Sequence, residues 1–208
     1  MNYTLKGDRG IEYSYAGARI PRPGPNPRCL DMGPGQRGRL AREAVKRGWH
    51  VTGVDLMTCD LEMPGFCFVR GDLRTVPLAG VFDLVLNVST IEHVGIPGRY
   101  GVARLEPDAD LEVMARTRKL MSTNGIMVLT LPVGLDAIHA PFHRIYGMTR
   151  MPLLLDGYDV LDAHYWHKTG NDDTIWTRAD AGEAMATRAT IDPTHYYAIG
   201  TLVLRRAV

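Results

Sequence analysis

Apolar and polar positions along the chain follow two alternating spacings. Short segments that are almost continuously apolar are typical of buried strands. Between them lie segments in which apolar residues recur every three to four positions, as in helices that bury one face. The predicted strands are residues 28–32, 50–56, 66–72, 82–89, 125–133, 158–167 and 195–206. The predicted helices are residues 35–48, 108–121, 148–157 and 177–189. This alternation predicts an α/β fold built on a parallel sheet.

A proline-rich segment from Ile20 to Arg28 separates the start of the chain from these elements. Proline disfavours both a helix interior and a central strand, so the segment is expected to be extended. We therefore predict an N-terminal arm or lid over residues 1–27, whose Tyr13 and Tyr15 pack or cover a ligand. Residues 28–208 then form one domain, which suits a chain of 208 residues.

The first predicted strand leads into a G-x-G-x-x-G loop with Gly33, Gly35 and Gly38. The pattern is typical of dinucleotide-binding loops, although a tight turn without a ligand also explains it. Two features disfavour a pyrophosphate: the Asp31 carboxylate would repel phosphate, and Pro34 lacks a backbone N–H. The loop therefore favours a cationic or hydroxyl-rich ligand, and an NAD-dependent oxidoreductase is the weaker alternative.

Two further carboxylates follow predicted strands. Ligands of parallel α/β sheets bind beyond the carboxyl ends of the strands, so these positions are the candidates for binding. Asp55 ends the second strand, 20 residues after Gly35, where a carboxylate can accept hydrogen bonds from both ribose hydroxyls. Asp72 follows the third strand, where it can contact an adenine amino group or simply occupy a turn.

Four segments, "CLDMGPGQ", "VTGVDL", "VRGDL" and "FDLVLNVSTIEHVG", resemble the successive motifs of class I S-adenosylmethionine-dependent methyltransferases over residues 28–134. The resemblance implies a Rossmann-like fold with a mostly parallel seven-stranded sheet, helices on both faces and an antiparallel last strand. It also implies S-adenosyl-L-methionine as the cofactor. The cofactor-binding residues implied are Asp31, Gly33, Pro34 and Gly35 around the methionine part, Asp55 and Leu56 at the ribose, Asp72 and Leu73 at the adenine, and Asn87 beneath the cofactor.

Methyl transfer to a hydroxyl needs a base or a metal ion to help remove the proton. His143 is the first candidate for the general base, because an imidazole accepts a proton near neutral pH. Glu92, His93 and His139 are candidate ligands of Mg²⁺, in a pattern similar to that of small RNA 3′-end methyltransferases. Ser89 stands where those enzymes have a second glutamate, and purely structural roles explain these residues equally well.

The segment from Pro141 to Trp166 resembles small bacterial methyltransferases of polysaccharide biosynthesis, especially actinobacterial sugar O-methyltransferases. One mycobacterial member methylates the 1-hydroxyl of a methylated mannobiose. The resemblance implies O-methylation of a sugar or short oligosaccharide, and methylation of another small molecule is the alternative. The aromatic residues that would suit a sugar platform, or equally a packed core, are Tyr13, Tyr15, His164, Tyr165 and Trp166.

The charge and composition of the chain limit the partners and the cell compartment that we expect for it. The net charge is +1 and no basic tract is present, so neither nucleic acid nor a membrane surface is expected as a partner. The first ten residues lack the apolar region of a secretory signal, and Cys29 and Cys67 are expected to be reduced core residues. We therefore expect a cytoplasmic protein, which can also form a homodimer. Asp108, Asp110 and Glu112 are expected to stabilise the start of a helix through its dipole.

Overall fold

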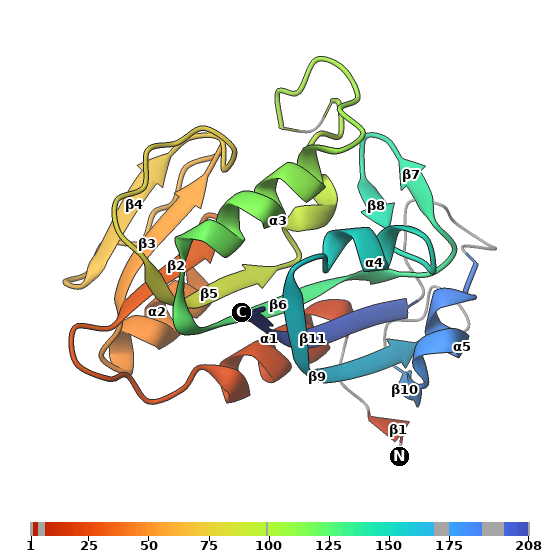
Figure 1. The fold of residues 1–208 in the computed structure, drawn as a ribbon, viewed down its shortest axis with the longest axis horizontal. Coiled ribbons are helices and arrows are strands. Elements are labelled where there is room, and N and C mark those ends of the chain that lie inside the picture. The colour runs from red at the N-terminus through yellow and green to blue at the C-terminus, as the bar shows by residue number, and fades with distance from the viewer. Residues whose placement is uncertain (1, 4–6, 99, 169–174, 189–197, 208) are drawn as a thin grey trace.

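The computed structural model describes residues 2–3, 7–98, 100–168, 175–188 and 198–207, and these form one large sheet with helices on both faces (Figure 1). Five parallel strands make one half of the sheet, in the spatial order β4 (Phe66–Arg70), β3 (His50–Asp55), β2 (Arg28–Met32), β5 (Phe82–Val88) and β6 (Met121–Val133). The first four strands of the sequence prediction are all present. Their carboxyl ends lie at one edge of the sheet.

The other half of the sheet is antiparallel. β11 (Ala198–Arg206) lies between β6 and β9 (Tyr158–His167) and runs antiparallel to both. β10 (Trp176–Ala179) and β1 (Asn2–Tyr3) extend this side by two more antiparallel strands. The predicted α/β fold with an antiparallel last strand is confirmed, but the sheet has nine strands among the described residues and not seven.

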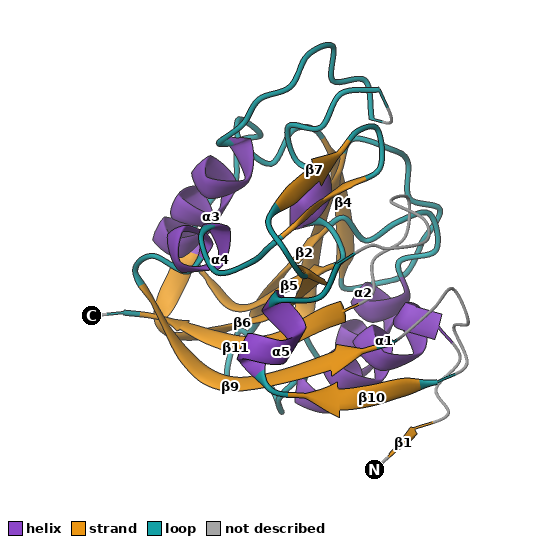
Figure 2. Ribbon diagram, turned by 90° about the vertical axis from the view of Figure 1, so that its right-hand side faces the viewer, coloured by secondary structure: helices purple, strands orange, loops and turns teal. Residues whose placement is uncertain are grey.

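Helices cover both faces of the sheet (Figure 2). Two apolar clusters fill the space between the sheet and these helices, one on each face. On one face, α1 (Gly7–Arg19) and α2 (Arg39–Lys46) pack through Tyr15, Ala16, Leu40 and Ala44. On the other face lie α3 (Ala109–Leu120), α4 (Arg150–Leu154) and α5 (Ala181–Met185). β5 is buried by both layers, which explains why its sequence is almost entirely apolar.

All four predicted helices are present and shorter than expected, and for α2 and α5 the structure shows the reason. α2 begins at Arg39 and not at residue 35, because Gly33, Gly35 and Gly38 all have positive φ and hold the preceding loop out of the helix. The prediction of a helix over residues 177–189 is wrong in its first part, because β10 occupies Trp176–Ala179. α5 starts after Asp180, whose side chain accepts a hydrogen bond from the Glu183 N–H.

Residues 7–19 of the predicted arm form the helix α1, which the sequence prediction lacked. Ile11, Tyr15 and Ala16 are buried against the sheet, and Glu12 is fully buried beside them. Tyr15 and Ala16 follow Ile11 by four and five positions, which places the three side chains on one side of the helix. The segment that follows, residues 20–27, has no helix or strand, as its prolines predicted. The domain limit at residue 27 stays a prediction.

A small hairpin follows β6 and consists of β7 (Ala137–His139) and β8 (His143–Ile145). A buried ionic cluster ties this hairpin to α3 and α4. Asp110 is 0% exposed and lies 3.2 Å from Arg144 of β8, 2.5 Å from Arg150 of α4, and 3.1 Å from the Tyr146 hydroxyl. Asp110 therefore does more than complement the helix dipole, because it is the anion between two arginines.

The cysteines and helix lengths add two observations. Cys29 is buried and reduced as predicted, but Cys67 is reduced and exposed, because β4 is the edge strand of the sheet. Within the described residues, no helix combines the length and the apolar character needed to cross a bilayer.

Asp110→Ala should lower the free energy of unfolding by about 3–5 kcal/mol, because it leaves two guanidinium groups without their buried counterion. Asp108→Ala is the matched control: Asp108 also pairs with Arg150 but is 68% exposed, and its loss should cost less than about 1 kcal/mol. Urea denaturation of both variants measures the difference, and equal values for the two would show that the cluster has no structural role.

Candidate functional site

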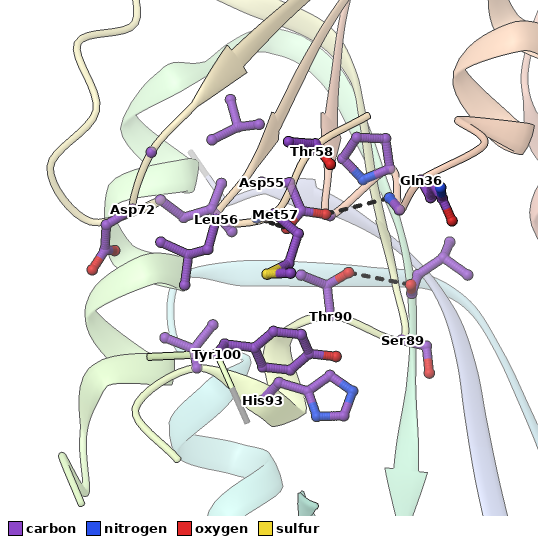
Figure 3. A pocket seen from close by; sticks show the side chains of 18 of the residues that line it. Gln36, Asp55, Leu56, Met57, Thr58, Asp72, Ser89, Thr90, His93 and Tyr100 are labelled. Carbon is purple, nitrogen blue, oxygen red and sulfur yellow. Dashed lines mark hydrogen bonds between the residues drawn. The ribbon is translucent and has the colours of Figure 1, made fainter. Parts of the chain in front are cut away.

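A pocket of about 570 Å³ opens at the carboxyl ends of β2, β3, β4 and β5, a size within the range of small-molecule sites. The loops after these four strands line it, together with α1 and the loop around Tyr100. Figure 3 shows that these residues converge on one space from different parts of the chain. The predicted cofactor residues among its lining are Gly33, Pro34, Gly35, Asp55, Leu56, Asp72 and Leu73.

The glycine loop depends on two left-handed glycines. Gly33 has φ of 69°, and a Cβ at this position would lie 2.4 Å from the Thr90 hydroxyl oxygen. That hydroxyl donates a 2.8 Å hydrogen bond to the Met32 carbonyl. Gly35 has φ of 64° and no atom within 4 Å of an added Cβ, so its backbone faces open space. The loop therefore holds bare backbone at the pocket wall, where a ligand can approach closely.

Asp55 lies at the end of β3 with its carboxylate in the pocket (Figure 3). One oxygen accepts a hydrogen bond from the Gly35 N–H at 3.3 Å, and the other accepts one from the Met57 N–H at 2.9 Å. These two bonds fix the carboxylate beside the glycine loop. Carboxylate oxygens can accept further hydrogen bonds, so Asp55 can also bind a diol.

Asp72 lies at another part of the pocket wall and is held by Arg74. Hydrogen bonds from the Arg74 side chain hold the pKa of Asp72 below its usual value, so the carboxylate is ionised at neutral pH. Arg74 also pairs with Glu106. The charge of Arg74 is therefore engaged by two carboxylates.

Asp31 and Asn87 do not line the pocket, although both were predicted to contact the cofactor. Asp31 is 3% exposed, and burial raises its pKa to about 7, with a hydrogen bond from the Ala41 N–H opposing the shift. Asn87 is fully buried, with its amide 3.8 Å from the Met114 sulfur. In this structure both residues lie behind the pocket wall, and their contact with a cofactor stays a prediction.

His93 contributes an oriented imidazole to the side of the pocket opposite Asp55 (Figure 3). Its Nδ1 lies 2.6 Å from the Phe142 carbonyl oxygen, which can only accept, so Nδ1 carries a proton. Nε2 lies 3.6 Å from Glu92, and the ring lies 5.3 Å from that of Tyr100. When the imidazole is neutral, Nε2 is therefore the basic nitrogen.

Glu92 lies under the pocket and is 1% exposed. The Ser89 hydroxyl donates a 2.8 Å hydrogen bond to one of its oxygens. Burial raises the pKa of Glu92 to about 7, because an ionised carboxylate is poorly solvated at this site.

His139 and His143 lie on the hairpin and not on the pocket wall. His143 is 4% exposed, and its ring centroid lies 5.9 Å from that of His139. The role of His143 as general base stays a prediction, because the histidine that lines the pocket is His93.

The candidate metal ligands Glu92, His93 and His139 do not fit a metal site in this arrangement. Glu92 is turned to Ser89, and the Nδ1 of His93 is turned to a carbonyl. Among the described residues, no group of three or more acidic, histidine or cysteine side chains is placed to hold a metal ion.

Among the aromatic residues suggested for a sugar platform, Tyr13 lines this pocket, and its contact with a sugar stays a prediction. Tyr15 is buried with its hydroxyl 3.1 Å from Asp162, and Trp166 is buried in β9. The lining residues that the sequence prediction missed include Arg9, Gln36 and Tyr100. Tyr13 and Arg9 share a face of α1 at a spacing of four residues, so recognition of that helix would have linked them.

A family model described as a Caenorhabditis protein of unknown function, DUF268, matches residues 74–206. The chain belongs to this family. The matched segment of DUF268 starts after the glycine loop and Asp55, so it includes only part of the pocket lining. Comparison with curated proteins gives no match.

Solved structures similar to this DUF268 chain share its fold. They include the [4+2]-cyclase SpnF, with 16% identity over 95% of this chain and 80% of that chain, and a TM-score of 0.64. The N-methyltransferase NodS from Bradyrhizobium japonicum WM9, in complex with S-adenosylhomocysteine, has 10% identity over 96% and 88%, with a TM-score of 0.60. The 1,6-didemethyltoxoflavin-N1-methyltransferase of Burkholderia thailandensis, also with S-adenosylhomocysteine bound, has 17% identity over 95% and 76%, with a TM-score of 0.55.

The structural similarity shows that the chain has a class I methyltransferase fold. The sequence identities are too low to show that it catalyses the same reaction as any of these proteins. The presence of a cyclase beside methyltransferases makes the same point, because one fold supports different chemistries. The chemistry of this chain therefore depends on the residues of its own pocket.

Gly33→Ala should distort the loop, because the new Cβ overlaps the Thr90 side chain and alanine disfavours a φ of 69°. We expect a loss of about 1–3 kcal/mol in the free energy of unfolding, measured by urea denaturation. Gly17→Ala in α1 is the control, since nothing lies within 4 Å of its Cβ, and it should leave stability unchanged or slightly higher. A Gly33→Ala variant as stable as wild type would contradict the assignment of this contact.

Proposed function

We propose that this chain is an S-adenosyl-L-methionine-dependent methyltransferase that acts on a small molecule. The observation that carries the proposal is the Asp55 carboxylate, fixed by the Gly35 and Met57 N–H groups at the end of β3 and open to the pocket. A carboxylate at this place suits a ribose. The S-adenosylhomocysteine bound by two similar structures supports the same reading.

The residues of the pocket fit the cofactor by charge as well as by position. Asp55 would accept hydrogen bonds from the ribose hydroxyls, Leu56 and Leu73 would contact apolar faces, and Asp72 would lie at the adenine. Gly33 and Gly35 would leave room for the methionine part. The cofactor supplies a methyl group on a sulfonium, and an acceptor needs only to be held in line and relieved of its proton.

We propose His93 as the base that takes this proton. Its Nδ1–H donates to the Phe142 carbonyl, so in the neutral imidazole Nε2 is the basic nitrogen, and the ring lines the pocket. Glu92 lies 3.6 Å from Nε2 and can stabilise the imidazolium that forms. His143 is the alternative base suggested by the sequence. Mg²⁺ enters no step of this proposal, because the described residues include no group of three or more side chains placed to hold a metal ion.

For the acceptor, we propose a hydroxyl of a sugar or short oligosaccharide, with the 1-hydroxyl of a methylated mannobiose as the first compound to test. The support is the resemblance of the Pro141–Trp166 segment to sugar O-methyltransferases and the two tyrosines on the pocket wall, Tyr13 and Tyr100. Aromatic rings pack against the apolar faces of sugars. Amines of small molecules are the alternative acceptors, as two similar structures are N-methyltransferases.

S-adenosylhomocysteine at 100 times its dissociation constant should stabilise the wild type by about 2.7 kcal/mol, seen as a rise in melting temperature. Asp55→Ala should abolish this rise, because both ribose hydrogen bonds are lost. Asp60→Ala, which removes an exposed carboxylate bonded to Gln36, should keep it. NAD should give no rise with any variant, and stabilisation by NAD alone would refute the proposed cofactor.

His93→Ala should lower the rate of methyl transfer by about 10²–10⁴-fold without changing the affinity for S-adenosylhomocysteine, because only proton removal is lost. His143→Ala should retain most of the activity. Labelled cofactor with panels of manno- and gluco-oligosaccharides and small amines, with and without Mg²⁺ and EDTA, measures both variants. The reverse order of effects would assign the base to His143, and activity lost only in EDTA would restore a metal.

A further inference from the structure

The N-terminal helix α1 carries an arginine whose charge acts both on the pocket and on buried carboxyls beneath it. Arg9 lines the pocket and has a half-exposed side chain. One of its nitrogens also lies 3.1 Å from a carboxylate oxygen of Glu12, one helical turn further along α1. Glu12 itself is 0% exposed. One cation therefore lies between a buried acid and an open binding site.

Glu12 is connected to the strand end that forms the pocket floor. The Thr130 hydroxyl of β6 donates a 2.8 Å hydrogen bond to Glu12, and the Ser89 N–H donates a 3.1 Å hydrogen bond to Thr130. The Ser89 hydroxyl in turn bonds to Glu92. The charged groups that face Glu12 are Arg9 and Asp8 on α1 and Glu92 after β5. Two buried acids, linked through Ser89 and Thr130, thus depend on the charge of Arg9.

Burial raises the pKa of Glu12 to about 7, while Arg9 opposes this shift and Glu92 adds to it. If the charge of Arg9 were drawn toward a ligand, the opposing contribution would weaken and the pKa of Glu12 would rise further. At pH values just above 7, Glu12 would then bind a proton.

The charges along the pocket wall indicate where an anionic group of a ligand can bind. Asp55 and Asp72 make the region after β3 and β4 unfavourable for a carboxylate. Arg74 is the second arginine in the lining, and it already pairs with Asp72 and Glu106. The region beside α1, where Arg9 and Tyr13 lie, is therefore the better place for an anion.

We propose that Arg9 binds the α-carboxylate of the cofactor by exchanging it for Glu12, so that cofactor binding is coupled to uptake of a proton by the buried Glu12. This inference rests on the proposed cofactor. In this proposal α1 supplies the positive charge of Arg9, which pairs with the carboxylate end of the ligand. The affinity for the cofactor should then be constant below the pKa of free Glu12 and weaken as the pH rises above it.

The experiment compares two ligands that differ at the carboxylate. S-adenosylhomocysteine carries it, and 5′-methylthioadenosine keeps the adenosine and sulfur but lacks the amino acid end. Titration calorimetry at pH 7.5, in buffers of different ionisation enthalpy, counts the protons taken up. We expect net proton uptake with S-adenosylhomocysteine and none with 5′-methylthioadenosine.

Arg9→Met keeps the aliphatic stem and removes the charge. It should weaken S-adenosylhomocysteine binding by about 10-fold or more and leave 5′-methylthioadenosine binding within about twofold. Glu12→Gln should bind S-adenosylhomocysteine without proton uptake and without the loss of affinity at high pH. Glu43→Gln is the matched control on α2, because Glu43 also pairs with an arginine but is exposed, and it should behave as wild type.

The possible failures are distinguishable. If wild type binds both ligands but Arg9→Met weakens them equally or not at all, the exchange is refuted while the proposed cofactor stands. Proton uptake that persists in Glu12→Gln refutes Glu12 as the acceptor. If wild type binds neither ligand, the proposed function itself is refuted. Melting temperatures of the variants without ligand identify any that fail to fold. Arg9→Lys keeps the positive charge, so it should bind S-adenosylhomocysteine more tightly than Arg9→Met does.

Discussion

The hydrogen bond from the Thr90 hydroxyl to the Met32 carbonyl joins the two loops on which the pocket depends. β2 and β5 are neighbours in the sheet, and this bond continues their association beyond the last paired residues, Met32 and Asn87. The bond requires Thr90 to lie against the Gly33 backbone, where only glycine fits. The same loop continues into Glu92 and His93. The position of the imidazole is therefore coupled to the shape of the glycine loop.

A second layer of constraint lies below the pocket. Glu12, Thr130, Ser89 and Glu92 form a connected polar group within an apolar core, and each hydrogen bond in it is buried or nearly so. Ser89 has φ of 52°, which is uncommon for a residue other than glycine. Such a conformation persists where the surroundings hold it. Here the Ser89 N–H donates to the carbonyl and hydroxyl oxygens of Thr130, and the Ser89 hydroxyl donates to Glu92. Apolar residues of similar volume would fill the space at lower electrostatic cost, so the group is best understood as the support of the pocket wall at Ser89.

The sequence predicted the parallel half of the sheet well, because strands such as β5 are buried on both faces and read as continuous apolar runs. Asp55 and the glycines were also predicted, since their spacing follows directly from strand–loop–helix geometry. The helix α1 was missed because the buried Glu12 interrupts its apolar face and because Gly10 and Gly17 lower its helix propensity. Arg9 could not be assigned without that helix. His93 follows β5 and His143 lies in β8, and only the structure shows which of the two reaches the pocket.

The strand order shows what the segment that matches DUF268 lacks when it is taken alone. β2 lies between β3 and β5, while the segment that matches DUF268 starts at residue 74, after β4. A protein cut to residues 74–206 would lose β2, β3 and β4 and turn β5, which both helical layers bury in the full chain, into an edge. Unpaired apolar edges recruit strands from other molecules. In this chain the segment that matches DUF268 therefore depends on the strands before it, and expressing residues 74–206 alone is expected to give aggregation.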